Sequence, residues 1–154
     1  MSAQFGNVQN KIKEILPPCE VCGFGLWHPI VGLTISSLGL YSDDRYPGRC
    51  ILSYTGSHAE QITDLADIDA TSLMTDLRTA VTAIQQVTGC ARVNVAFLSN
   101  TVPHLHAHLI PRHPDSEPTP QRPIWDDPRP RRDLAPLDVN GLTMAIRKAI
   151  VTHR

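Results

Sequence analysis

The 154-residue chain lacks several features that would assign it to a particular class of protein. Its 14 basic and 15 acidic residues give a net charge of −1, so it has no basic excess for binding a nucleic-acid polymer. It also has no uninterrupted apolar run approaching the ~20 residues of a membrane span. The first residues, to Leu16, lack the apolar core of a secretory signal. We therefore expect a cytoplasmic protein with neither a nucleic-acid nor a membrane partner.

Compositional bias and internal repeats are missing as well. With 42% hydrophobic and 19% charged residues the composition is typical of a globular protein, and the length predicts a single domain over 1–154. Cysteine is scarce, at four residues, and a cytoplasmic location would keep the thiols reduced. Cys19 and Cys22 are therefore interpreted as metal ligands or redox thiols before structural disulfide partners.

The hydrophobic pattern predicts a mixture of helices and strands. We expect an N-terminal helix within 1–18, and a long central helix that is capped by Asp69 and ends at Gly89. A last helix, capped by Asp138, is expected within 137–154. Strands are predicted within 30–40, 49–54 and 92–98, and in the segment from residue 104 to residue 110. The order indicates an α+β fold with an antiparallel sheet.

Proline is concentrated in one segment, since eight of the thirteen prolines lie within 111–136. The residues 113–136 are therefore predicted to form an extended loop. A loop of this length is more often functional than a simple connection.

Three of the seven histidines lie at alternate positions, as His104, His106 and His108, and the residues between them are aliphatic. In a β-strand, alternate side chains project from one face, so this pattern would align three imidazoles and bury Leu105 and Ala107 opposite. Imidazole can act as a nucleophile, an acid or a metal ligand near neutral pH. The sequence predicts the functional centre here.

This histidine pattern, with Asn100 and Thr101 before it and Pro111-Arg112 after it, resembles the signature of the histidine-triad (HIT) family. The segment 46–52 (YPGRCIL), a following His58 and the central helix occur in the family's order, so the resemblance covers a HIT core over 19–112. The resemblance implies an α+β HIT-like fold, often dimeric. It also implies a nucleotide hydrolase or nucleotidyl transferase, acting on a small-molecule nucleotide such as a dinucleoside polyphosphate or a nucleoside phosphoramidate.

The resemblance also implies roles for particular residues. His106 would attack the α-phosphorus and form a nucleotidyl-histidine intermediate, and His108 would donate to the phosphate or leaving group. Asn100 and Thr101 lie where the family contacts phosphate oxygens. The ribose hydroxyls would face an acidic residue, either Asp43 or Asp44.

The pair Cys19 and Cys22 has the spacing of one half of a tetrahedral zinc site. The zinc-containing branch of the family implies that His58 and His104 supply the other half, as a structural site. Two ordinary reduced thiols are the alternative. Redox use is disfavoured, because the pair follows Pro17-Pro18 and no clear helix pattern follows it.

One position departs from the family pattern, because Arg49 stands where many members have a histidine that supports the nucleophile. A guanidinium cannot accept a hydrogen bond, so Arg49 is expected to bind phosphate or form a remote ion pair. Three alternatives remain open: a nucleotide-binding module with little turnover, a zinc hydrolase that uses the triad and His113 as ligands, and a histidine-rich strand without chemistry.

Overall fold

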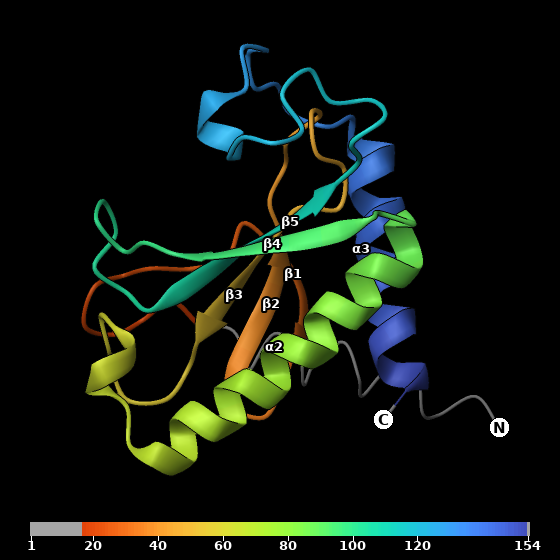
Figure 1. The fold of residues 1–154 in the computed structure, drawn as a ribbon. Helices are drawn as coiled ribbons and strands as arrows, with labels where there is room; N and C mark the ends of the chain where they lie inside the picture. The colour runs from red at the N-terminus through yellow and green to blue at the C-terminus, as the bar shows by residue number, and fades with distance from the viewer. Residues whose placement is uncertain (1–16, 154) are drawn as a thin grey trace, which may run out of the picture.

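A computed structural model describes residues 17–153, and their centre is one antiparallel sheet of five strands in the order β1-β2-β3-β5-β4 (Figure 1). The strands are β1 (His28–Gly32), β2 (Ser36–Leu40), β3 (Cys50–Tyr54), β4 (Arg92–Phe97) and β5 (His106–Arg112). The α+β expectation is confirmed. The helix expected before Pro17 lies outside the described residues.

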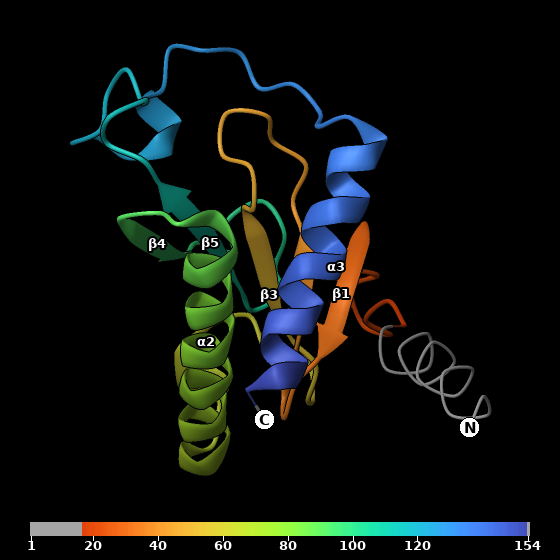
Figure 2. The ribbon, with the colours of Figure 1, turned by 90° about the vertical axis from the view of Figure 1, so that its right-hand side faces the viewer.

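Two long helices pack side by side on one face of the sheet (Figure 2). They are α2 (Asp67–Thr88) and α3 (Pro136–Thr152), and two short 3-10 turns, η1 (Ile62–Asp64) and η2 (Ile124–Asp126), lie in the connections. Helix α2 ends at Gly89 in the left-handed conformation, with φ of 64°, as predicted. The core between helices and sheet includes Leu38 and Leu52 from strands and Ile84 and Ile146 from helices.

The caps of both helices lie three residues before the predicted caps, so both predicted starts are late by the same kind of error. Helix α2 begins after Ala66 and α3 begins after Ala135, so Asp69 and Asp138 lie in the first turn instead of at the cap. A carboxylate in the first turn is favourable because it faces the positive end of the helix dipole. The sequence signal was therefore real, but it marks the first turn as well as the cap.

Strand β5 lies inside the sheet, between β3 and β4, where both of its edges are hydrogen-bonded. Leu105, Ala107 and Leu109 are buried in the main core, as the alternating pattern predicted. The strand begins at His106, however, so His104 belongs to the preceding loop. No described helix has the length and apolarity that crossing a membrane would require.

A buried carboxylate ties α2 to the turn between β1 and β2. Asp76 accepts hydrogen bonds from the backbone N–H groups of Thr34 and Ile35, at 3.1 and 2.9 Å, and from the hydroxyl of Ser36 at 2.7 Å. Because the group is buried, these donors have no water to replace it.

We predict that Asp76→Ala lowers the free energy of unfolding by about 3 kcal/mol, because it leaves buried donors unpaired. Urea denaturation followed by circular dichroism measures the change. The neighbouring variant Thr75→Ala, on the exposed side of α2, should change stability by less than about 0.5 kcal/mol. Equal effects of the two variants would contradict the assignment.

Candidate functional site

The imidazole of His106 is buried on β5 and held in one tautomer. Its Nδ1 lies 2.6 Å from the backbone carbonyl oxygen of His104. A carbonyl oxygen only accepts, so Nδ1 carries the hydrogen and Nε2 keeps its lone pair. Burial also lowers the pKa of His106, which favours the neutral ring. The arrangement leaves an uncharged nucleophilic nitrogen at Nε2.

The imidazole of His104 faces a different group of residues. Its Nε2 lies 2.8 Å from the carbonyl oxygen of Tyr54 and must therefore donate, which leaves Nδ1 as the lone-pair nitrogen. That Nδ1 lies 3.4 Å from the Sγ of Cys22. The ring of Phe24 stacks on both His104 and His106, with centroids 4.9 and 5.2 Å away. Phe24 thus joins the cysteine loop to the triad.

Four ligand-type atoms gather at this place, within 4.8 Å of one another, from Cys19, Cys22, His58 and His104. Cys19 Sγ lies 3.5 Å from His58 Nδ1, and ligand atoms on a tetrahedral zinc ion lie about 3.6 Å apart, given bond lengths of about 2.0–2.3 Å. The backbone N–H of Cys22 helps to lower the pKa of the Cys19 thiol to about 6, which favours the thiolate that binds metals. These donors fit a tetrahedral metal ion, and the cluster includes neither His106 nor His108.

The ring of His108 lies next to that of His106, with centroids 5.2 Å apart, and it contacts Arg49. Arg49 Nη2 lies 3.1 Å from His108 Nδ1, and Arg49 Nη1 lies 2.9 Å from Asp43 Oδ2. Burial lowers the pKa of His108 to about 4, and the charge of Arg49 and the neighbouring His106 lower it as well. The expected ion pair of Arg49 is therefore present, with Asp43. It is not remote from the triad, however, because the same guanidinium also contacts His108.

The residues expected at phosphate and ribose lie in unequal environments. Asp43 is 0% exposed, and both of its carboxylate oxygens accept hydrogen bonds from Arg45 or Arg49. Such an occupied carboxylate has no free face for ribose hydroxyls, which differs from the expected arrangement. Asp44 is exposed, and Asn100 and Thr101 are exposed in the connection between β4 and β5.

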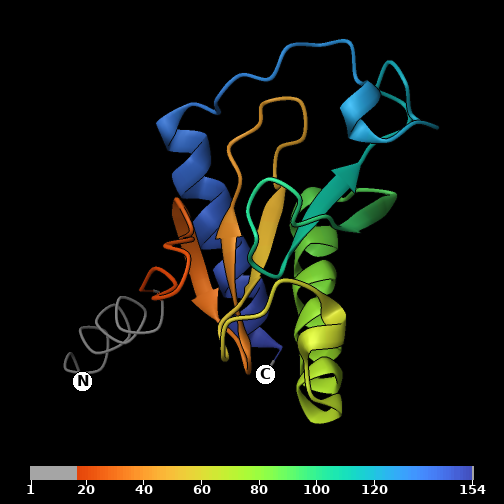
Figure 3. The same ribbon diagram turned by 90° about the vertical axis from the view of Figure 1, so that its left-hand side faces the viewer.

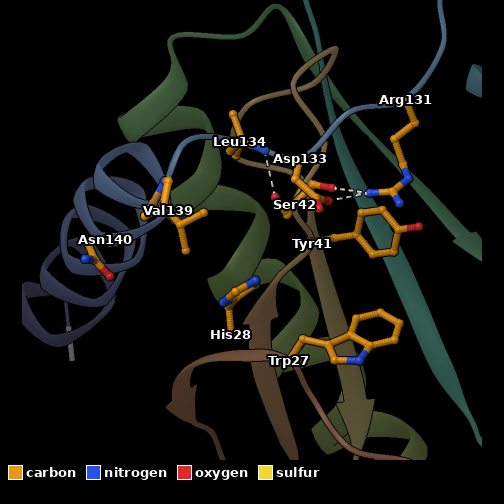
Figure 4. A pocket seen from close by; sticks show the side chains of 10 residues that line it. Trp27, His28, Tyr41, Ser42, Arg131, Asp133, Leu134, Val139 and Asn140 are labelled. Atoms are coloured by element: carbon orange, nitrogen blue, oxygen red, sulfur yellow. Dashed lines mark hydrogen bonds and ion pairs between the residues drawn. The ribbon is translucent and has the colours of Figure 1, made fainter.

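A cavity of about 830 Å³ opens beside Tyr41, with no triad histidine in its lining, and it was not foreseen from the sequence. Trp27 and Tyr41 line one side, and residues of the first turns of α3, among them Val139 and Asn140, line the other (Figure 4). Tyr41 also faces His108 edge-on, with centroids 6.3 Å apart. The volume lies within the range of small-molecule sites, of about 300–1,000 Å³. Trp27 and Tyr41 were the available sequence signal for this cavity, but nothing in the sequence indicates that the two side chains lie together.

The proline-rich segment 113–135, called the strap below, crosses one end of the sheet between β5 and α3 (Figures 2 and 3). Arg112 holds its first part through Glu117 and the carbonyl oxygen of Arg122, at 2.7 and 2.8 Å. Tyr46 holds its middle through Asp127, at 2.6 Å. Ile124 is buried with Tyr46, whereas the neighbouring Trp125 is 55% exposed and faces His108 edge-on. The strap thus brings an exposed aromatic ring to the triad.

Comparison with known proteins agrees with this geometry. Residues 42–115 match the family model of the HIT domain. A histidine triad protein from Bradyrhizobium japonicum is similar in structure, with a TM-score of 0.73 and 26% identity over 91% of this chain and 94% of that one. No curated protein sequence matches this chain closely enough to count as a relative.

Two more distant solved structures share the fold. A Zn-bound histidine triad family protein from Mycobacterium smegmatis has a TM-score of 0.57 and 15% identity, over 81% of this chain and 84% of that one. The diadenosine triphosphate hydrolase of Plasmodium falciparum has a TM-score of 0.53 and 14% identity, over 95% and 93%.

The contact between Tyr46 and the strap provides a test of how the strap is held. Burial raises the pKa of Tyr46 to about 12, so the phenol remains a neutral donor to Asp127. We predict that Tyr46→Phe speeds hydrogen exchange of the backbone at 124–129 by about fivefold, since a hydrogen bond contributes about 1 kcal/mol. Exchange within α2 should not change. Tyr41→Phe is the matched control, because the hydroxyl of Tyr41 makes no hydrogen bond among the described residues. Equal exchange at 124–129 in both variants would refute the proposed role of Tyr46 in holding the strap.

Proposed function

Because this chain belongs to the histidine-triad family, we propose that it is a nucleotide hydrolase or nucleotidyl transferase that acts at the α-phosphate through a nucleotidyl-histidine intermediate. The observation that carries the proposal is the hydrogen bond from His106 Nδ1 to the carbonyl oxygen of His104. It directs the lone pair of Nε2 away from the backbone, and an imidazole in this state is a competent nucleophile.

In the proposed reaction the lone pair of His106 Nε2 forms a bond to the α-phosphorus, and the bond from phosphorus to the leaving group breaks. The imidazole becomes positively charged, and the carbonyl of His104 stabilises that charge through the retained Nδ1–H. Water then attacks the same phosphorus and releases a nucleoside monophosphate and the free imidazole. With another acceptor in place of water, the outcome is nucleotidyl transfer.

The cavity that adjoins the triad through Tyr41 supports binding of a nucleotide. The cavity beside Tyr41 has room for a nucleoside, and Trp27 offers an exposed aromatic face on which a base can stack. We propose that Asn100 and Thr101 contact phosphate oxygens and that Asp44 remains the candidate for the ribose, since the carboxylate of Asp43 is occupied. A dinucleoside polyphosphate, as the name of the Plasmodium falciparum relative indicates for that protein, is one substrate class of this kind.

We also propose a structural zinc ion, held by Cys19, Cys22, His58 and His104. The donor set and spacings fit tetrahedral zinc, and a distant relative is Zn-bound. The ion would join the loop before β1 to the triad. The hydrogen bond from His104 Nε2 to Tyr54 would orient that ligand.

A homodimer is the proposed assembly. Among the described strands β4 lies at the edge of the sheet and is hydrogen-bonded only to β5, and Val95 on it is 40% exposed. An unpaired edge with an apolar side chain is a surface that a second copy of the chain can cover.

The mechanism predicts a covalent adduct on His106. After incubation with labelled dinucleoside polyphosphate and quenching in base, wild type should carry a nucleotidyl-histidine, located by peptide mass spectrometry. His106→Ala should form none and should lose at least about a thousandfold in turnover. His153→Ala, a histidine at the far end of α3, should behave as wild type.

Two results would contradict the proposal. Wild type that binds nucleotide but forms no adduct would be a binding module with little turnover. Hydrolysis by His106→Ala at the wild-type rate would exclude His106 as the nucleophile.

The zinc assignment predicts a division within the triad. Cys22→Ser and His58→Ala should lower the zinc content per chain, measured by plasma mass spectrometry, whereas His106→Ala should retain it, because His106 lies outside the cluster. Cys90→Ser is the matched cysteine control and should keep its metal. Loss of metal from His106→Ala, together with loss of activity on chelation, would favour the zinc-hydrolase alternative.

A further inference from the structure

A buried arginine, the last residue before β3, holds the ring of His108. Arg49 is 5% exposed and follows Gly48, whose φ of +95° and close approach to Thr88 require glycine. A Cβ on Gly48 would lie 2.5 Å from Thr88 Cγ2. The guanidinium carbon of Arg49 lies 3.9 Å from the ring centroid of Tyr41, so the planar group is fixed on one face as well as by its hydrogen bonds.

We propose that Arg49 is a positioning residue that fixes His108 in the tautomer with its hydrogen on Nε2. The argument is that a guanidinium has only N–H donors, so Nδ1 of His108, 3.1 Å from Arg49 Nη2, must accept. The neutral ring then carries its hydrogen on Nε2. The role of this N–H as a donor to the reacting phosphate or leaving group rests on the proposed function.

Neighbouring imidazoles of the triad are thereby set in opposite tautomers. His106 carries its hydrogen on Nδ1 and His108 carries it on Nε2, because one faces a carbonyl oxygen and the other a guanidinium. A lone pair for attack and an N–H for the phosphate thus lie on rings 5.2 Å apart. In many members of the family the residue at the position of Arg49 supports the nucleophile. In this chain it would control the donor, His108, instead.

The charges around His108 also oppose its protonation. Arg49 faces it from the β2–β3 connection, with Asp43 and Arg45 behind, and this group of three carries one net positive charge. His106 faces it from its own strand and Tyr41 from the end of β2, while Trp125 of the strap is uncharged. The pKa of His108, lowered to about 4, agrees with a neutral donor rather than an imidazolium acid.

The contacts of Arg49 exceed what pairing Asp43 requires. Arg45 already binds both oxygens of Asp43, at 2.9 Å through Nε and 2.9 Å through Nη2. Meanwhile the buried Nε of Arg49 has no partner among the described residues. Removing Arg49 therefore leaves Asp43 paired and removes a buried cation that is costly to desolvate. We expect Arg49→Met to fold, because the apolar methionine side chain can keep the packing against Tyr41.

The test is long-range ¹H–¹⁵N correlation spectroscopy of histidine-labelled protein, which reports the tautomer of each ring. Wild type at pH 7 should show His108 with its hydrogen on Nε2 and a titration midpoint near 4. In Arg49→Met the ring should populate both tautomers, and the midpoint should rise by about one pH unit. Arg45→Met, which removes a partner of Asp43 without touching His108, should leave the His108 spectrum as in wild type.

Turnover gives a second readout. Arg49→Met should lower kcat by about ten- to a hundredfold and change KM by less than about threefold, because the donor is lost more than the binding. An Nδ1–H tautomer of His108 in wild type, or an unchanged spectrum in Arg49→Met, would overturn the inference. Absence of a nucleotidyl adduct in wild type would instead overturn the proposed function, and the spectra would still show whether Arg49 sets the tautomer.

Discussion

The hydrogen bond between His106 Nδ1 and the carbonyl oxygen of His104 is the interaction on which the rest of the site depends. It decides which nitrogen is free, and it is made within one stretch of chain, so it needs no distant partner. Strand β5 is hydrogen-bonded on both edges, to β3 and to β4, so the backbone that carries the His106 ring is held in place. A site on a central strand is therefore held more rigidly than one on a loop.

The three triad histidines share a sequence pattern but not an environment. His104 faces two cysteines and a further histidine, His106 faces a backbone carbonyl, and His108 faces a guanidinium. The carbonyl oxygen of Tyr54 on His104, the backbone carbonyl on His106 and the guanidinium on His108 each accept or donate in only one sense, so each ring is left with one defined nitrogen for a further partner. Phe24 packs on two of the rings, so the loop that carries the cysteines packs directly against the triad.

Much of the fold was predictable, and the failures have common causes. The alternation of apolar residues located β5 and its buried face, and Gly89 located the end of α2, because both signals are local. The start of β5 was wrong because His104 turns away to the carbonyl of Tyr54, a residue of another strand. Arg49 was expected to bind phosphate or form a remote ion pair, because side-chain chemistry limits only the kinds of group that a guanidinium binds. The pairing of Ile51 with His108 decides which groups it can reach.

Local patterns in the chain set the strand, its two faces and the set of groups able to do phosphoryl chemistry, because side-chain direction in a strand follows from backbone geometry alone. Folding decided which group meets which. The pairing of β3 with β5 brings Arg49 to His108, and the loop before β1 brings Cys22 to His104. The tautomer of a ring depends on such a neighbour, and neighbours distant in sequence are joined only by tertiary packing.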